Sequence, residues 1–206
     1  MGALSQLIER GGPPLGPGSA FDPGGAGATP LAAELAGLIA ARDGFFVADE
    51  ALVVFPGYSP AAPLDLVRLN AGNWRNAYWH LCQGLYFFAA DALGDLFALA
   101  GDKVVRFATE TGMAEPMADS LEGWAEAILA DPAGQTGWPF MKAWREANGP
   151  VRPGWRLTGR EPFVLGGGFD LANLQAVDLV DILTFRGRLA SKIHDLPPGA
   201  EIRMAT

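Results

Sequence analysis

Three side chains carry the chemistry in this sequence that could work near neutral pH: His80, Cys82 and His194. His80 and Cys82 are two residues apart in the run HLC, so on a strand both would face one side and could bind a soft metal ion or form a Cys–His pair. His194 lies about half a chain away, and no second pair has metal-ligand spacing. We therefore favour a structural role, a half-buried strand edge behind Trp79, and predict no catalytic residue, no metal and no cofactor.

Other patterns depart from the motifs of catalytic or phosphate-binding sites. The glycine triplet at 166–168 follows an apolar run, but it lacks the G-x-G-x-x-G spacing and no Lys-Ser/Thr follows it. Ser59 in PGYSP has no glycine two residues later. Asp91, Asp95 and Asp102 stand at turn positions, where aspartate is expected for backbone reasons. These residues favour turn formation over acid–base chemistry, and we predict that the protein is not an enzyme.

Composition excludes several classes of protein. The 206 residues are 50% hydrophobic and 18% charged, enough apolar material for one sizeable domain and too much for wholesale disorder. The net charge of −8 has the wrong sign for binding nucleic acid or an anionic membrane. No segment approaches the roughly 18 apolar residues of a spanning helix. The single cysteine and the lack of a signal-peptide pattern predict a reducing compartment, the cytoplasm.

Negative charge is concentrated in the middle of the chain. Residues 87–131 contain nine acidic and two basic residues, which is −7 of the net −8. If the turns and the following helix lie together, they form one acidic surface that would steer a basic partner, although a merely solvated face is the simpler interpretation. The residues predicted to bind the partner through charge are Asp91, Asp95, Asp102, Asp119 and Glu122.

Two of the six tryptophans are candidates for an exposed binding anchor. Trp74 and Trp79 lie in the polar stretch LNAGNWRNAYWH, whereas Trp124 and Trp144 fall on apolar helix faces. We expect Trp74 and Trp79 to be partly exposed and to act as anchors for a protein partner.

The first 30 residues differ from the rest of the chain. Residues 11–30 hold seven Gly and five Pro and few large apolar groups, so residues 1–30 are predicted to be a flexible segment preceding a domain over 31–206. Leu4, Leu7 and Ile8 are spaced for one short amphipathic turn before this stretch.

The remaining pattern predicts an α+β fold. Thr29-Pro30 is typical of a helix start, and the runs GFFVA and ALVVFP suggest a hairpin. Three strand-like runs between residues 84 and 108 form an antiparallel meander, in which Gly101-Asp102 fits a type II′ turn. Helices are expected from a capping box at Asp119 and Glu122, over 139–147 and within 176–194, with a closing strand AEIRM. We predict a single domain with a largely antiparallel sheet packed against several helices; a doubly wound α/β fold is the weaker alternative.

Several segments together resemble the SUKH superfamily, which joins yeast Smi/Knr cell-wall regulators to bacterial proteins encoded beside toxins. The segments are GFFVADEALVVFP, NWRNAYW, YFFAADALGDLFAL, VVRFATETG, MADSLEGWAEAILAD, PFVLGGGFDLANL and KIHDLPPGAEIRM, and they span roughly residues 30–206. The central part resembles the superfamily's core most closely, because two strands joined by a Gly-Asp turn lead through a short strand into a tryptophan-bearing helix.

The resemblance implies a binding role and supplies no catalytic residues. Many bacterial members resemble immunity proteins that bind a toxin domain, often a nuclease, and block it. We therefore expect a cytoplasmic, non-enzymatic protein that neutralises a basic toxin domain. The alternatives are a regulatory or scaffolding adaptor without a toxin partner, as the yeast relatives suggest, and an enzyme that uses His80, Cys82 and His194. The sequence leaves the oligomeric state open.

Overall fold

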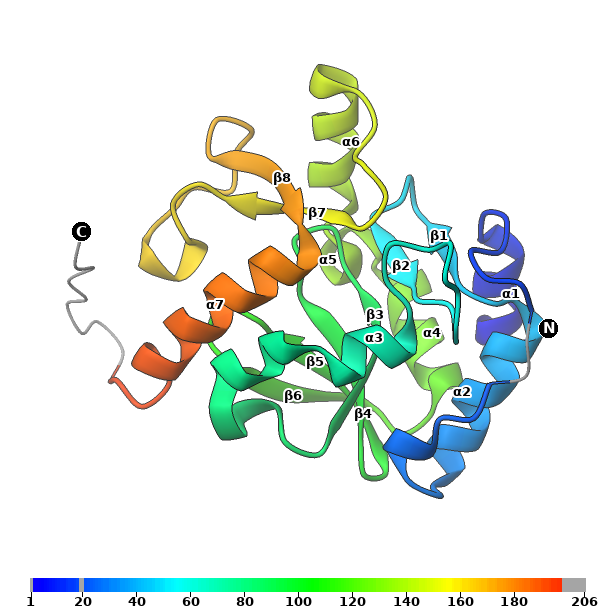
Figure 1. Ribbon diagram of the computed structural model, residues 1–206. Helices are drawn as coiled ribbons and strands as arrows, with labels where there is room; N and C mark the ends of the chain where they lie inside the picture. Colours follow the sequence, from blue (N-terminus) through cyan, green and yellow to red (C-terminus); the bar gives the residue numbers. More distant parts are fainter. Residues whose placement is uncertain (1, 19–20, 198–206) are drawn as a thin grey trace.

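A six-stranded antiparallel sheet is the centre of the computed structural model, which describes residues 2–18 and 21–197 (Figure 1). Its strands lie side by side in sequence order: β1 (Phe45–Val47), β2 (Leu52–Val54), β3 (Leu85–Ala90), β4 (Leu96–Ala100), β5 (Lys103–Ala108) and β6 (Met113–Ala118). The predicted hairpin and meander are therefore confirmed as parts of one sheet. Gly101 takes φ +62° in the two-residue turn between β4 and β5, as a type II′ turn requires.

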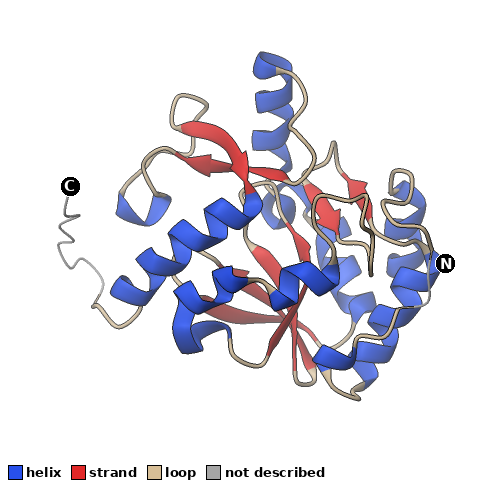
Figure 2. Ribbon diagram, in the orientation of Figure 1, coloured by secondary structure: helices blue, strands red, loops and turns tan. Residues whose placement is uncertain are grey.

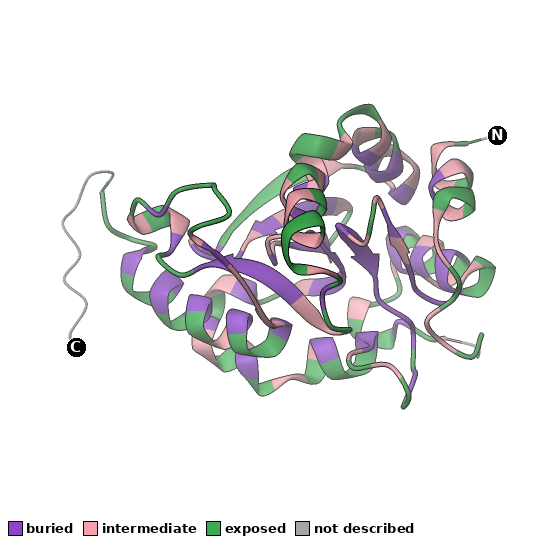
Figure 3. Cartoon of the chain, turned by 90° about the horizontal axis from the view of Figure 1, so that it is seen from above, coloured by how far each residue is buried: buried purple, intermediate pink, exposed green. Residues whose placement is uncertain are grey.

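Helices cover both faces of this sheet (Figure 2). One layer consists of α3 (Leu66–Ala71), the 3₁₀ segment η2 (Asn73–Cys82) and α7 (Leu179–Ile193). The other layer is built around α4 (Leu121–Ala130), which contacts α1 (Ala3–Arg10), α2 (Pro30–Ala41) and α5 (Pro132–Thr136). Figure 3 shows buried and exposed residues alternating around these helices, as expected for amphipathic helices. The molecule is a single α+β domain, as predicted.

Aromatic side chains fill the space between the sheet and each helical layer. Trp124 of α4 contacts Phe88 and Phe97 edge-on, with ring centroids 5.0 and 5.7 Å apart. On the opposite face Tyr78 of η2 packs against Phe107 at 5.2 Å. Because β3 and β4 are buried on both faces, their sequences read as continuous apolar runs rather than alternating ones.

A smaller unit stands beside the main sheet. Strands β7 (Trp155–Gly159) and β8 (Leu174–Asp178) form a hairpin, and α6 (Trp138–Asn148) packs with it around Met141, Leu157 and Leu174. The 3₁₀ turn η3 (Phe163–Leu165) lies in the connection between β7 and β8. The sequence pattern did not predict this hairpin. The helix expected within 176–194 is present as α7.

The prediction of a flexible segment over residues 1–30 is wrong for the part that the structure describes. Helix α1 packs against α4, and Leu7 is completely buried. The following residues are held by backbone bonds, since the N–H of Gly12 donates to Phe46 O and that of Gly16 donates to Asp43 O, both at 2.8 Å. A 3₁₀ turn, η1 (Gly24–Ala26), precedes α2. The domain boundary expected at residue 30 is therefore absent, because a buried leucine and hydrogen bonds to later parts of the chain hold this glycine-rich stretch on the domain.

The starts of two helices test the capping predictions. Thr29 caps α2 as predicted: its Oγ1 accepts the N–H of Ala32 at 3.1 Å. Helix α4 begins one residue later than expected, because Ser120 and not Asp119 is its cap, with Oγ accepting the N–H of Gly123 at 3.0 Å. The predicted capping box at Asp119 and Glu122 is thus corrected, and both carboxylates are used elsewhere.

Two glycines inside helices should respond oppositely to replacement by alanine. A Cβ on Gly187 of α7 would lie 2.8 Å from Ala77 Cβ and from a ring carbon of Tyr78, because α7 and η2 approach closely there. We expect Gly187→Ala to lower the free energy of unfolding by about 1–3 kcal/mol through overpacking. Urea denaturation measures the change.

Gly37 of α2 is the matched control, since a Cβ there meets no atom of the described residues within 4 Å. Gly37→Ala should raise the free energy of unfolding by about 0.5–1 kcal/mol, the ordinary gain in helix propensity. If both substitutions stabilise the protein, α7 and η2 do not pack as described.

Two further sequence predictions are a closing strand near the C-terminus and the lack of a membrane-spanning helix. The closing strand AEIRM lies outside the described residues. Among the helices of residues 2–18 and 21–197, none is both long and apolar enough to cross a bilayer.

Candidate functional site

The turn that joins β3 to β4 is organised by one buried carboxylate. Asp91 is fully buried, and its Oδ1 accepts the N–H groups of Leu93 and Asp95, each at 2.9 Å. Gly94 completes the turn with φ +85°, a conformation that glycine adopts without steric cost. The backbone role predicted for aspartate at position 91 is therefore confirmed.

Arg106 of β5 pairs with both carboxylates of this turn. Its Nη2 lies 2.6 Å from Asp91 Oδ2 and 3.5 Å from Asp95 Oδ2. The guanidinium also stands over the ring of Phe97, its partner in the β4–β5 register, with 5.9 Å between Cζ and the ring centroid. Strand pairing thus brings the arginine directly to the turn, where it compensates the buried charge.

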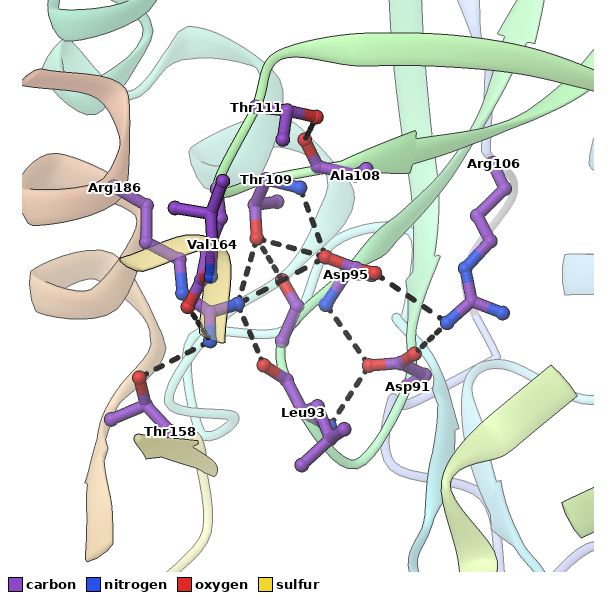
Figure 4. A network of polar contacts seen from close by, with 12 residues as sticks. Asp91, Leu93, Asp95, Arg106, Ala108, Thr109, Thr111, Thr158, Val164 and Arg186 are labelled. Carbon is purple, nitrogen blue, oxygen red and sulfur yellow. Dashed lines mark hydrogen bonds and ion pairs between the residues drawn. The ribbon is translucent and has the colours of Figure 1, made fainter. Parts of the chain in front are cut away.

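A second arginine, Arg186 of α7, is buried at the centre of the network shown in Figure 4. Its Nη1 donates to Leu93 O and to Thr109 Oγ1, both at 2.8 Å. Its Nη2 lies 3.2 Å from Glu110 Oε1 and donates to Thr158 Oγ1 at 3.2 Å. One side chain therefore connects α7 to the main sheet and to the β7–β8 hairpin.

Burial governs the titration of Asp91. Loss of water raises the pKa of its carboxyl group from the ordinary 3.8 to about 7, and the charge of Asp95 acts in the same direction, while Arg106 and Arg186 oppose it. Because the pKa is higher in the folded than in the unfolded chain, the stabilisation from this group is complete below about pH 4. It is lost as the pH rises towards about 7.

A pocket of about 340 Å³ opens above this network. Its charged lining consists of Asp91, Asp95, Glu110, Arg106 and Arg186, and its aromatic lining consists of Phe140, Phe163 and Phe169. We call it the aromatic pocket. Phe169 is 58% exposed and stacks on Phe163 with ring centroids 4.2 Å apart. Aromatic faces and a surplus of carboxylates both attract cations, so the pocket can accept an ammonium or guanidinium group.

The predicted acidic residues do not form one surface. Successive turns of a meander lie at opposite ends of the strands, so Asp102 is separated from Asp91 and Asp95 by a five-residue strand, about 16 Å. Asp102 is exposed, and the exposed Asp119 pairs nearby with Lys103, with 2.7 Å between Oδ1 and Nζ. The prediction of a single acidic surface is therefore wrong: the acidic residues are divided between the two ends of the sheet.

Glu122 is occupied inside the molecule. Its carboxylate accepts the N–H groups of Ala3 and Leu4, the latter at 3.1 Å, at the start of α1. An anion is favourable at a helix N-terminus, so this contact helps to hold α1 on α4. Glu122 is thus a structural residue rather than part of an open binding face.

The two candidate tryptophan anchors have opposite environments. Trp74 is only 2% exposed, and its Nε1 donates to Leu69 O at 3.0 Å, so its expected exposure is wrong. Trp79 is 78% exposed, as expected, and adopts φ +54°, a strained conformation for a residue other than glycine. Exposure of a large aromatic side chain on strained backbone is consistent with a binding role.

His80 and Cys82 do not share a face. They belong to η2 and not to a strand; His80 is exposed and Cys82 is buried. Burial raises the pKa of the Cys82 thiol, which disfavours the reactive thiolate. His80 and His194 instead line one pocket of about 260 Å³ beside Trp79. Within the described residues, no group of three or more His, Cys, Asp or Glu side chains is placed to hold a metal ion.

Sequence reasoning missed Arg186 and the aromatic lining of the pocket. A signal for Arg186 was present, because it lies four residues after Ile182 and three after Leu183, on the apolar stripe of α7. An arginine on such a stripe needs buried partners. Phe163 and Phe169 gave no comparable signal, since they belong to an irregular loop.

The comparisons with known proteins concern the fold alone. No model of a known protein family matches the sequence, and no curated protein matches it. The crystal structure of Atu4351 from Agrobacterium tumefaciens is similar, with a TM-score of 0.61 over 88% of this chain and 86% of that chain, at 12% identity. This likeness supports the α+β architecture. The resemblance to the SUKH superfamily stays a prediction.

Proposed function

We propose that this protein is a non-catalytic, cytoplasmic immunity protein that binds and neutralises a basic toxin domain, of nuclease type, through the aromatic pocket. The observation that carries the proposal is the pairing of an exposed aromatic rim with a lining of three carboxylates and two guanidiniums. A lysine or arginine side chain of the partner would place its charged end near the carboxylates and its stem against the rings. Nuclease domains are basic where they contact phosphates, which supplies such side chains.

Exposed apolar side chains on the β7–β8 connection and on α7 support a protein partner. Phe169, Val164 and Leu171 belong to the β7–β8 connection, and Val180 and Phe185 belong to the neighbouring helix α7; all are at least 36% exposed. Helix α7 also contacts η2, the segment in which Trp79 is exposed. Ser191 Oγ of α7 donates to Ala77 O of η2 at 2.6 Å. Aromatic and aliphatic side chains of this kind are typical of the centres of protein interfaces.

The charged groups of the pocket are better suited to binding than to catalysis. Asp91 is held by two N–H groups and Arg106, and Glu110 is held by Arg186 and by the N–H of Val164 at 2.8 Å. Carboxylates whose oxygens are already held by hydrogen bonds and ion pairs have few contacts left to offer a reacting group, and their positions in the pocket are fixed. We infer that the network sets the shape and charge of a docking site.

The test begins with the full-length protein, tagged and recovered from its own cells at low and at high salt, with mass spectrometry of the bound polypeptides. We expect a basic polypeptide that is retained at low salt and released at high salt. Isothermal titration calorimetry with that polypeptide should then show that Phe169→Ala weakens binding about ten-fold or more, because Phe169 forms the rim.

Asp102→Asn is the matched control, since Asp102 is an exposed carboxylate at the opposite end of the sheet. It should leave the affinity unchanged. The proposal is wrong if Phe169→Ala binds as the parent does while Asp102→Asn does not. A partner that is neither basic nor sensitive to salt would support the adaptor alternative instead.

A further inference from the structure

Arg156 of β7 is a buried cation that has no carboxylate within ion-pair distance among the described residues. It is only 5% exposed, and its side chain makes one hydrogen bond among the described residues, from Nη1 to Trp155 O at 3.1 Å. Its Nε is buried and has no hydrogen-bond partner in the described part of the chain. None of the ion pairs found among residues 2–18 and 21–197 involves Arg156, whereas the other buried arginine, Arg186, pairs with Glu110.

A buried guanidinium in this state is costly for the fold. Charged groups in protein interiors are normally paired, because removing them from water without compensation is strongly unfavourable. Burial lowers the pKa of Arg156 to about 10, while the more distant charges of Asp91 and Glu50 act in the opposite direction, so the group stays cationic at neutral pH. The ring of Phe46 lies 5.5 Å from its Cζ and offers a cation–π contact on one side. The Nε and Nη2 groups take part in no hydrogen bond among the described residues.

The same arginine lines a pocket of about 190 Å³, which is far more room than one water molecule needs. Apart from Arg156, the walls are almost entirely apolar. They come from β1 and β2, from the loops that precede α3 and β7 and from the start of α7, and they include Phe46, Val53, Phe55, Leu64, Pro153 and Leu179. We call this the Arg156 pocket. It shares no residue with the aromatic pocket.

We propose that the Arg156 pocket binds a small organic carboxylate, with its anionic group paired to the guanidinium and its aliphatic or aromatic body against the apolar walls. A carboxylate matches the planar, two-pronged donor geometry of arginine. A single cation among apolar walls suits one negative charge, and a dianion such as phosphate would lack further donors. The ligand would satisfy the orphan N–H groups and exclude water from the pocket in one step.

The test uses the purified full-length protein with hexanoate and benzoate as probes and hexanamide as the uncharged control. Both carboxylates should raise the thermal unfolding midpoint in a concentration-dependent way, because a ligand that binds only the folded state stabilises it. Titration calorimetry should show that hexanamide binds at least about ten-fold more weakly than hexanoate, since the amide lacks the charge that pairs with Arg156.

Arg156→Met separates ligand binding from folding. Replacing an unpaired buried charge by an apolar side chain of similar length should leave the midpoint without ligand unchanged or raise it, while abolishing the shift produced by hexanoate. Arg152→Gln is the matched control, because Arg152 is an exposed arginine just before β7 and does not line the pocket. It should keep the full shift.

Two outcomes would overturn the proposal. Absence of any shift with either carboxylate would mean that the pocket holds water only. Equal shifts with hexanoate and hexanamide, or a shift that survives in Arg156→Met, would mean that the guanidinium does not recognise the anion. Neither result bears on the toxin-binding proposal, because these measurements use no partner and the Arg156 pocket shares no residue with the aromatic pocket.

Discussion

Arg186→Met should lower the free energy of unfolding by about 3–5 kcal/mol, as removal of one partner from a buried ion pair generally does. The substitution leaves Glu110 buried opposite an apolar side chain and removes donors from Leu93 O and Thr109 Oγ1. Because Arg186 also contacts Thr158 of β7, the loss should loosen the β7–β8 hairpin together with α7. Urea denaturation followed by circular dichroism measures the change.

Two further variants sharpen this prediction. Arg188→Met, on the exposed side of the same helix, should stay within about 0.5 kcal/mol of the parent protein. Adding Glu110→Gln to Arg186→Met should recover part of the loss, because the unpaired charge is then removed. A loss for Arg186→Met no larger than that for Arg188→Met would contradict the network drawn in Figure 4.

Trp124→Ala should cost about 3–5 kcal/mol, the range for truncating a large aromatic side chain in a core. Trp124 is completely buried and contacts Phe88 and Phe97 across the face of the sheet. Its Nε1 has no hydrogen-bond partner among the described residues, so packing alone accounts for its contribution. Trp124→Phe, which keeps an aromatic ring, should therefore cost much less. Chemical denaturation of both variants provides the comparison.

Trp79→Ala is the control for truncating a tryptophan. Trp79 is 78% exposed, and alanine at φ +54° is strained as tryptophan is, so the stability should change by less than about 0.5 kcal/mol. Similar losses for Trp124→Ala and Trp79→Ala would show that α4 does not cover the sheet as described.

Local signals in the sequence were sufficient for much of the fold. Thr29-Pro30 and Gly101-Asp102 act through contacts within a few residues, and both produce the predicted structure. The apolar runs of β3, β4 and β5 were equally readable. The β7–β8 hairpin was missed because its strands are joined by a connection of 14 residues, far longer than the two- to five-residue turns by which a hairpin is usually recognised.

The candidate site was harder to predict because it depends on contacts between distant parts of the chain. Asp91 and Asp102 look alike as turn residues, yet one is buried beneath Arg106 and the other is exposed at the opposite end of the strands. The difference arises from which turn α7 and the β7–β8 connection cover, and no local pattern reports that. Trp74 and Trp79 differ for the same reason: only Trp74 faces the sheet, where it contacts Phe87 at 5.4 Å.

The two outer strands of the main sheet limit how copies of this protein can associate. At β1 the carbonyl of Phe46 already accepts a hydrogen bond from the N–H of Gly12, so this acceptor is not free to pair with a strand of a second molecule. At β6 the backbone is exposed, but Pro116 has no N–H to donate and Glu115 brings a charge to the margin. Proline and charge at an edge strand are known obstacles to amyloid-like extension. Addition of a further strand to the main sheet is therefore hindered at both margins, which disfavours its lateral growth into fibrils.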